Sequence, residues 1–511
     1  GCLCAACAAT VRSAARSPLT GSATLTDCIH LERNGDDIMS RRDHNQQVER
    51  TQQEATARGL RPLVYVSDPS SIATNLLPDP ARESDLRGWI DELADAGVDT
   101  ICQEVFSQGW TAYFQSRHPD YEYDQRLQHR RFLPMLEHGV TPLEILIDQA
   151  HQRGLRFLAG FRMNDGHAFQ ARQQGLSISR FIETHQDLQL TSYPEGEFYK
   201  LAEPLDFRHA QVRDFTFAIV DEVMTRFDVD GVELCFRDHG YFPVDEGPGR
   251  AHLMTELVER LRKRVGGSTM GVRLFGTLDE CLTLGLDAPA WIDAGLLDYV
   301  SPQDVMYADA HIPVAEWAEL TEKSDCDLYP ALLPWSSIRA RGRLDQIPLS
   351  EANQRALAHT CYEAGADGLS VYNHFCTFWH APFYPQQLHG LGHLRDSERV
   401  ARGHRHYVFD PTWDRFGGFG GEGRTSTGAV RASRMSLDRG QTGASGEYPF
   451  SLYEDLEKAT AATLLLRGFG LSELDELEMR LNGHLIPGDA VRRTRRSDAP
   501  VQWDHTQVID G

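Results

Sequence analysis

Short apolar segments alternate with amphipathic helical patterns from residue 61 to residue 372, and this alternation limits the fold more than any other feature of the chain. Helices are predicted at 85–96, 142–153, 211–226, 252–265 and 351–364. Strands that alternate with helices over short connections form parallel sheets, and eight such units close a (β/α)8 barrel. We therefore predict an α/β fold with a TIM barrel over residues 59–400. Its eight strands are predicted at 63–67, 99–105, 156–161, 230–237, 269–275, 297–301, 327–332 and 367–372.

The segments on either side of the predicted barrel have a different character. Residues 8–58 are rich in Ser, Thr, Arg, Gln and Glu with little periodicity, so we predict that residues 1–58 form a poorly ordered N-terminal segment. Residues 401–511 contain short alternating runs and the hairpin signal Asn482-Gly483. We predict that they form a small all-β, sandwich-like accessory domain.

Composition excludes several classes of partner. The 511 residues carry a formal charge of −23, which argues against nucleic acid as a partner. The apolar runs are too short for a membrane helix. The ten cysteines show no spacing typical of a disulfide framework, and we find no secretory signal pattern. We therefore expect a cytoplasmic protein, and we predict no cofactor or metal; the sequence leaves the oligomeric state open.

The predicted fourth strand carries charged residues in an apolar context. Because side chains alternate along a strand, Glu233, Cys235 and Arg237 share one face, and in a parallel barrel that face points to the centre. Buried charges cost free energy unless they are paired or functional. Glu233 and Arg237 therefore form either a structural ion pair or part of a catalytic or substrate-anchoring site. Asp238 follows the strand at the barrel mouth, where it is either catalytic or a loop cap.

Polar residues also follow the other predicted strands. Arg162, Asn164, Asp165 and His167 come after the third strand, and their donors and acceptors suit sugar hydroxyls. The alternative interpretation of this cluster is a structural turn, because Asn-Asp-Gly is a turn signal. Arg273 lies inside the fifth strand, and the other acidic candidates near strand ends are Asp68, Glu104, Asp279, Glu280 and Asp304.

Aromatic residues stand near the last two predicted strands. Trp335 follows the seventh strand, and Tyr372, Asn373 and His374 end the eighth. Aromatic faces with a few polar groups suit sugar rings, whereas core packing is the alternative for the aromatic side chains. We predict that these residues bind substrate.

Four motifs occur in a characteristic order along the barrel region. They are Arg162-Met-Asn-Asp165 with His167, Leu205-Asp-Phe-Arg208, Asp228-x-Asp230-Gly-Val-Glu-Leu234 and the segment 285–298. Together they resemble the bacterial family-10-like glycosyl hydrolases over roughly residues 60–385. The resemblance implies a barrel with a C-terminal β domain that hydrolyses a glycan. One departure stands out, because the position of Cys235 is commonly an Asp in that family.

We therefore expect a glycosidase that cleaves O-glycosidic bonds of a poly- or oligosaccharide by carboxylate general acid/base chemistry. Three arginines near the mouth favour an acidic sugar, since an Arg fork binds a carboxylate in bidentate fashion. The acid and the base are expected among Asp165, Glu233, Asp238, Glu280 and Asp304. Substrate contacts are expected from Arg162, Asn164, His167, Arg237, Arg273, Trp335, Tyr372, Asn373 and His374.

Other functions stay open at this stage. A carbohydrate-binding barrel that has lost catalysis is suggested by Cys235, which is either a buried small residue or a nucleophile. A metal-dependent hydrolase on the same fold is disfavoured, since the first strand lacks a His-x-His pair. The short Cys2-x-Cys4-x-x-Cys7 motif lacks the further ligands of a zinc site. A lyase acting on uronic acids is a weaker third alternative.

Overall fold

The computed structural model describes most of the predicted barrel and parts of the C-terminal region. The described residues are 41–68, 76–107, 110–111, 113–123, 127–164, 172, 178–190, 203–237, 240–243, 245–303, 308, 310, 312–334, 349–372, 374, 384–409, 441, 443–447, 450–455, 457, 462–464 and 475–492. The chain separates into two compact units, Ser17–Tyr453 and a second unit made of Gly1–Arg16 with Glu454–Gly511. The predicted barrel lies within the first unit.

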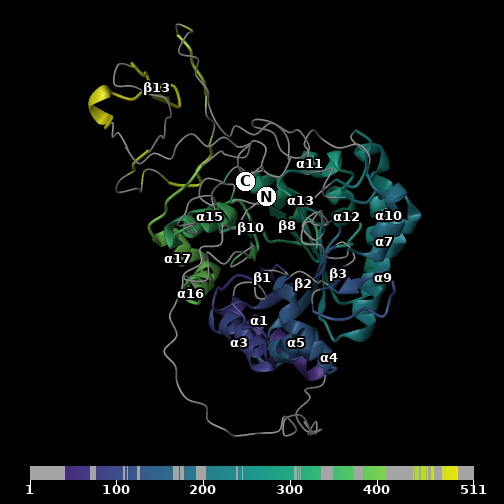
Figure 1. Ribbon diagram of the computed structural model, residues 1–511. Helices are drawn as coiled ribbons and strands as arrows, with labels where there is room; N and C mark the ends of the chain where they lie inside the picture. Colours follow the sequence, from purple (N-terminus) through teal and green to yellow (C-terminus); the bar gives the residue numbers. More distant parts are fainter. Residues whose placement is uncertain are drawn as a thin grey trace, which may run out of the picture. The chain divides into compact units, whose positions relative to one another are not determined.

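A parallel sheet forms the centre of the first unit (Figure 1). Each strand pairs in parallel with its neighbours along this ring, which confirms the predicted α/β barrel. In the order of pairing, its strands are β10 (Ala331–Leu332), β11 (Leu369–Tyr372), β1 (Leu63–Ser67), β2 (Thr100–Ser107), β5 (Arg156–Arg162), β6 (Gly231–Cys235), β7 (Thr269–Phe275), β8 (Tyr299–Gln303) and β9 (Asp327–Leu328). Two short strands, β3 (Trp110–Thr111) and β4 (Glu122–Tyr123), extend the sheet beside β2.

These nine strands correspond to the eight predicted ones, because β9 and β10 are two halves of the predicted seventh strand. β9 pairs with β8 and β10 pairs with β11, so this segment closes the ring. The interruption falls at Tyr329-Pro330, where the proline has no N–H to donate to a ladder. Its carbonyl still accepts from Ser370 N at 3.1 Å, and Tyr329 N donates to Val300 O at 2.9 Å.

Alternate strands of the ring are preceded by an aspartate whose carboxylate accepts a backbone N–H near the start of a neighbouring strand. We call Asp99, Asp230, Asp298 and Asp367 the strand-start aspartates. These carboxylates satisfy donors that the ladder itself leaves open at strand starts. They also divide the ring into the pairs β1–β2, β5–β6, β7–β8 and β9–β11. The four bonds are Leu63 N to Asp99 at 2.9 Å, Phe157 N to Asp230 at 2.8 Å, Met270 N to Asp298 at 2.6 Å and Leu328 N to Asp367 at 2.9 Å.

Helices cover the outside of the ring (Figure 1). The larger ones are α3 (Glu83–Asp95), α5 (Pro142–Gln152), α9 (Ala210–Arg226), α10 (Gly247–Val265), α13 (Val314–Thr321) and α15 (Glu351–Glu363). Shorter helices are α4 (Leu133–Glu137), α7 (Arg180–Thr184), α11 (Leu278–Thr283), α12 (Ala288–Asp293), α16 (Gln386–Leu391) and α17 (Ser397–Arg402), with 3-10 turns η1 (Leu127–Phe132), η2 (Gln186–Leu188) and η4 (Gly392–Arg395). Local signals set their ends, since α5 starts with proline in its first turn and Ser350 caps α15 in a capping box.

The strand alternation separates two apolar clusters. Outward side chains such as Tyr65, Ile101 and Phe157 pack against the helices in the larger cluster. Inward side chains, among them Val64 and Leu158, form a smaller cluster inside the ring. Parity along the strands therefore decides which residues reach the barrel interior.

A helix precedes the barrel within the segment that was predicted to be poorly ordered. α1 (Arg41–Ala57) is the described part of residues 1–58, and residues 1–40 lie outside the described part of the chain. Val48 is its most buried apolar residue, at 6% exposure. Polar contacts attach the helix instead, including His44 with Asp230 and Gln52 with Arg156. The sequence pattern misses this helix because its partners lie more than 100 residues away.

The described C-terminal residues include one β-hairpin. β12 (Arg480–Leu481) pairs antiparallel with β13 (His484–Leu485). Asn482 and Gly483 join them with φ of 48° and 79°, the left-handed geometry that Asn-Gly turns adopt. The hairpin agrees with the signal in the sequence; a short 3-10 turn, η6 (Gly488–Ala490), follows it. Most of the predicted β-sandwich lies outside the described residues and stays a prediction. Among the described helices, none is both long and apolar enough to cross a membrane.

Candidate active site

One group of polar side chains fills the barrel interior near the carboxyl ends of β1, β2, β5 and β11. We call Asp68, Glu104, Arg162 and Tyr372 the Glu104 network. Arg162 Nε donates to Glu104 Oε2 at 2.9 Å, and Arg162 Nη2 donates to Asp68 and, at 2.8 Å, to Tyr372 Oη. The Tyr372 hydroxyl lies 3.2 Å from both Glu104 oxygens. Asp68 is the most exposed member, with 13% of its side chain accessible.

Gly160 makes room for this network. It pairs in register with Glu104, and a Cβ at Gly160 would lie 2.9 Å from Glu104 Cγ and 3.0 Å from Cys102 Sγ. The missing side chain allows Glu104 to extend across the neighbouring strand toward Arg162. A sequence pattern shows this glycine only as an interruption of an apolar strand.

A second group lies on β6, β7, β8 and β11. We call Glu233, Arg273, Tyr299, Ser301, Gln303 and Ser370 the Glu233 network. Arg273 binds Glu233 with both Nε and Nη2 at 2.9 Å, and Tyr299 Oη donates to Glu233 Oε2 at 2.7 Å. The remaining guanidinium N–H groups of Arg273 donate to Ser301 and Ser370 hydroxyls and to Gln303 Oε1, at 2.7–3.0 Å.

Burial and charge fix the protonation of this second network. Burial alone would lower the pKa of Arg273, but Glu233 outweighs it and holds the pKa above the ordinary value. Burial, with the adjacent Glu233 charge, also raises the pKa of Tyr299 well above its ordinary value. Arg273 therefore stays a cation and Tyr299 stays a hydrogen-bond donor at neutral pH.

Tyr372 joins the two networks. The guanidinium carbon of Arg237 lies 4.4 Å from the Tyr372 ring centroid, and that of Arg273 lies 5.1 Å from it. Both distances suit cation–π attraction. The three arginines expected near the mouth therefore come together. The structural ion pair of Glu233 is formed with Arg273, however, and not with Arg237 as one interpretation of the sequence supposed.

The arginine forks already hold carboxylates of the protein. Arg162 binds Asp68 and Glu104, and Arg273 binds Glu233 through two nitrogens. Three interior carboxylates thus pair with two of the three arginines, Arg162 and Arg273. A substrate carboxylate would have to compete with these buried pairs, which lessens the support for an acidic sugar.

Asn164 holds two connecting segments together. Its Nδ2 donates to Leu205 O at 3.0 Å and to Gly240 O at 2.7 Å, and its Oδ1 accepts from Leu205 N at 2.9 Å. The side chain therefore links the segment after β5 to the segments that precede α9 and follow β6. This contact set gives Asn164 a positioning role at the mouth.

The other described candidates lie at the same end of the barrel. Glu280 stands in the first turn of α11, directly after β7, and is 1% exposed. His374 follows β11 at 2% exposure, and its carbonyl accepts from Tyr65 Oη at 3.4 Å. Cys235 is buried and pairs in register with Arg162 and Arg273.

Six predicted site residues fall outside the described part of the chain. Each follows a barrel strand by one to five positions in the sequence. They are Asp165, His167, Asp238, Asp304, Trp335 and Asn373.

Several residues of the interior networks were not predicted from the sequence. Ser301 and Gln303 share the inward face of β8 with Tyr299, and Ser370 shares that of β11 with Tyr372. These residues could have been found in the sequence, because each lies two or four positions from a residue of the same strand that faces the interior.

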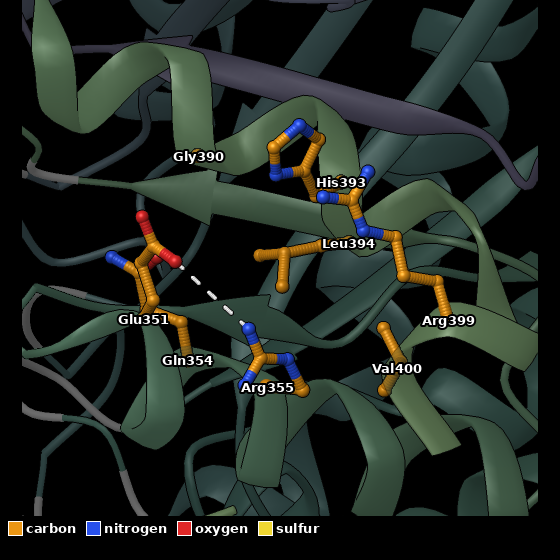
Figure 2. Close-up of a pocket in the computed structure, with 8 residues that line it drawn as sticks. All are labelled: Glu351, Gln354, Arg355, Gly390, His393, Leu394, Arg399 and Val400. Atoms are coloured by element: carbon orange, nitrogen blue, oxygen red, sulfur yellow. Dashed lines mark ion pairs between the residues drawn. The ribbon is translucent and has the colours of Figure 1, made fainter. Parts of the chain in front are cut away.

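A small surface pocket lies between α15, α16, η4 and α17 (Figure 2). Glu351 and Arg355 form an ion pair at 3.9 Å on one side of it. None of the described site residues predicted from the sequence lines this pocket, and we assign no function to it. Its full lining is Glu351, Gln354, Arg355, Gly390, His393, Leu394, Arg399 and Val400.

One family model matches part of the barrel region. Residues 70–265 match the family described as glycosyl hydrolase-like 10, which confirms the resemblance found in the sequence and the predicted glycosidase class. The matched region contains β2, β5 and β6 and therefore Glu104, Arg162 and Glu233. No curated protein matches the chain.

Solved glycosidase structures resemble the chain at low identity. The glycoside hydrolase domain of PgaB from Bordetella bronchiseptica is 13% identical, with a TM-score of 0.44, and the match covers 66% of this chain and 99% of that domain. An α-L-fucosidase from Paenibacillus thiaminolyticus is 13% identical, with a TM-score of 0.43, over 67% of this chain and 50% of that one. A maltogenic α-amylase from Thermotoga neapolitana is 12% identical, with a TM-score of 0.38, over 66% and 76%. At these scores we draw no conclusion about substrate or mechanism from them.

Proposed function

We propose that this chain hydrolyses O-glycosidic bonds of a poly- or oligosaccharide, because residues 70–265 match the glycosyl hydrolase-like 10 family. The observation that carries the proposal is this family match together with the carboxylate and arginine networks beneath the carboxyl ends of the strands. Barrel enzymes bind and transform substrates at that end. Hydrolysis there would use one carboxylic acid to protonate the leaving oxygen and a second carboxylate to activate water or attack the sugar.

The contacts of each carboxylate decide which ones suit that chemistry. Both oxygens of Glu233 already hold partners, and those of Glu104 hold Arg162 and Tyr372. We therefore assign Glu233 to positioning Arg273 and Glu104 to positioning Arg162. The acid and the base are then proposed among Asp165, Asp238, Glu280 and Asp304.

The substrate-binding roles follow from the same contacts. We propose that Asp68 and the Arg162 it binds contact sugar hydroxyls, because Asp68 is the most exposed member of its network. Arg237, Arg273 and Tyr372 line the interior below them, and His167, Trp335, Asn373 and His374 complete the contacts. Since the forks of Arg162 and Arg273 hold protein carboxylates, a neutral sugar is favoured over an acidic one.

The test is product release from neutral and acidic polysaccharides and aryl glycosides. Wild type is compared with Asp165→Asn, Asp238→Asn, Glu280→Gln and Asp304→Asn, each with its Tm measured. Loss of one catalytic carboxyl lowers kcat/KM by about 10²–10⁴-fold without unfolding the protein. Asp214→Asn is the matched control, because Asp214 pairs with Arg260 at the surface and is 61% exposed. Full activity in all four variants would contradict the assignment.

A second candidate function is carbohydrate binding without catalysis. It is favoured by Cys235, which is buried between Arg162 and Arg273 in the register where the related family commonly has an Asp. A wild type that binds glycan but releases no product would support this candidate. Cys235→Asp would then be expected to gain turnover. A metal-dependent hydrolase predicts loss of turnover on chelation.

A further inference from the structure

A cluster of two histidines and one aspartate lies away from the candidate active site. His44 comes from α1, His151 from the end of α5, and Asp230 from the residue before β6. His44 Nε2 lies 3.1 Å from Asp230 Oδ1, and His151 Nε2 lies 3.3 Å from Asp230 Oδ2. One nitrogen or oxygen from each residue can be chosen so that all three atoms lie within 4.8 Å of one another.

The cluster stands at the amino-terminal end of the strands. Asp230 also accepts the N–H of Phe157, at the start of β5. Arg162, by contrast, stands at the other end of β5. α1 lies against α5 on the outside of the sheet, because the rings of His44 and His151 stack (Figure 1). An ion at this cluster would therefore be remote from the barrel mouth.

Asp230 differs in its partners from two of the other strand-start aspartates. Asp99 is paired with Arg395 at 2.8 Å, and Asp298 with Arg262 at 2.8 Å. Asp230 faces two imidazoles instead, and no arginine or lysine is paired with it among the described residues. Its side chain is 10% exposed and that of His44 is 1% exposed. A buried carboxylate of this kind calls for a compensating positive charge.

The ligand set and its spacing fit a divalent transition metal. Imidazole nitrogens and a carboxylate oxygen are common zinc ligands. With bonds of about 2.0–2.1 Å, tetrahedral geometry separates neighbouring ligand atoms by roughly 3.3 Å. The observed N···O separations of 3.1–3.3 Å match that value. We propose that His44, His151 and Asp230 form a structural binding site for zinc or a similar divalent metal, which fixes α1 to the amino-terminal end of the barrel.

One further observation bears on the affinity of this site. His44 Nδ1 has no hydrogen-bond partner among the described residues, whereas a metal-binding imidazole usually donates its other ring N–H to a carboxylate, a carbonyl or water. Loss of such a partner typically weakens a site by about 10–100-fold, so a moderate affinity is expected.

The competing account is a hydrogen-bonded cluster without metal. The two imidazole rings stack with centroids 3.6 Å apart and planes 24° apart, and each Nε2–H can donate a hydrogen bond to Asp230. Metal binding would displace both protons to Nδ1 and turn the rings toward a common point. The two accounts differ in whether the protein takes up one ion per chain at this position.

The experiment measures Zn²⁺ and Co²⁺ binding to the full chain after chelator treatment and dialysis. Calorimetry gives the stoichiometry, and the visible absorption of Co²⁺ reports its ligands. His151→Gln keeps an N–H donor near Asp230 but removes the imidazole ligand. We expect one ion per chain in wild type, a Tm raised by Zn²⁺, and an affinity at least about 100-fold lower in His151→Gln, with no Tm shift.

Controls separate this site from other metal ligands of the chain. A variant with Cys2, Cys4 and Cys7 changed to Ser must bind as wild type does. His118→Gln removes an exposed histidine that lies 3.7 Å from Asp120 and should also change nothing. Equal binding by wild type and His151→Gln, or no binding by wild type, would overturn the proposal. Neither result depends on whether the chain has glycosidase activity.

Discussion

Replacing Glu233 with Gln tests whether the Glu233 network supports the barrel. The substitution keeps the size of the side chain and removes the charge that faces Arg273, which is fully buried. Leaving one member of a buried ion pair alone typically costs about 3–5 kcal/mol. For a barrel of roughly 340 residues, an unfolding entropy near 0.7 kcal/mol/K converts that cost into a Tm decrease of about 4–7 °C.

The assay is differential scanning calorimetry of wild type, Glu233→Gln, Arg273→Met and the double variant. Because the double variant removes both charges, its Tm should lie well above the value expected from adding the two single decreases. Glu398→Gln is the matched control, since the Glu398–Arg402 pair is 77–78% exposed and such pairs contribute about 0–1 kcal/mol. A Glu233→Gln protein that melts within about 1 °C of wild type would refute the reasoning.

Two further outcomes follow from single positions. Gly160→Ala should destabilise the barrel by about 1–3 kcal/mol, because the new Cβ would lie 3.0 Å from the Glu104 backbone. Gly88→Ala on α3 places its Cβ where nothing lies within 4 Å, so it should stabilise the protein by about 0.5–1 kcal/mol. Denaturant titration measures the free energy of unfolding of both variants, and an equal change in the two would contradict this prediction. The lowered pKa of Asp230 means that its contribution to stability is present above its unfolded value of 3.8 and is lost as the pH falls below that value. Calorimetry from pH 6 to pH 3 should therefore show a smaller Tm decrease in Asp230→Asn than in wild type. An equal Tm decrease in the two proteins would contradict this contribution of Asp230 to stability.

The barrel could be predicted from the sequence because short apolar strand segments alternate with amphipathic helical segments, and turn residues separate them. The segments 63–67 and 269–275 coincide with β1 and β7, and the interrupted strand 327–332 was recognised as one unit. These features are local, so composition and spacing carry them. α1 is different, because Val48 is its most buried apolar residue and its attachments are polar.

Parity also predicted which side chains enter the barrel, but it could not choose their partners. Glu233 pairs in register with Gly271, and its ion pair forms diagonally with Arg273, two residues further along β7. Arg237 shares the face of Glu233 but lies over the Tyr372 ring. Such choices depend on the stagger between neighbouring strands, which no single strand pattern encodes.

The strand-start aspartates also bear on how the chain folds. Each one ties two parallel strands together at their starts, and the bonded residues are 36, 28 and 39 positions apart in β1–β2, β7–β8 and β9–β11. In β5–β6 the separation is 73 positions. Because loop-closure entropy grows with the number of residues enclosed, the three short pairs can close early and the β5–β6 pair closes at a higher entropic cost. Assembly of the ring is thus expected to wait on the segment that brings Asp230 to Phe157, the same segment that α1 later covers through His44.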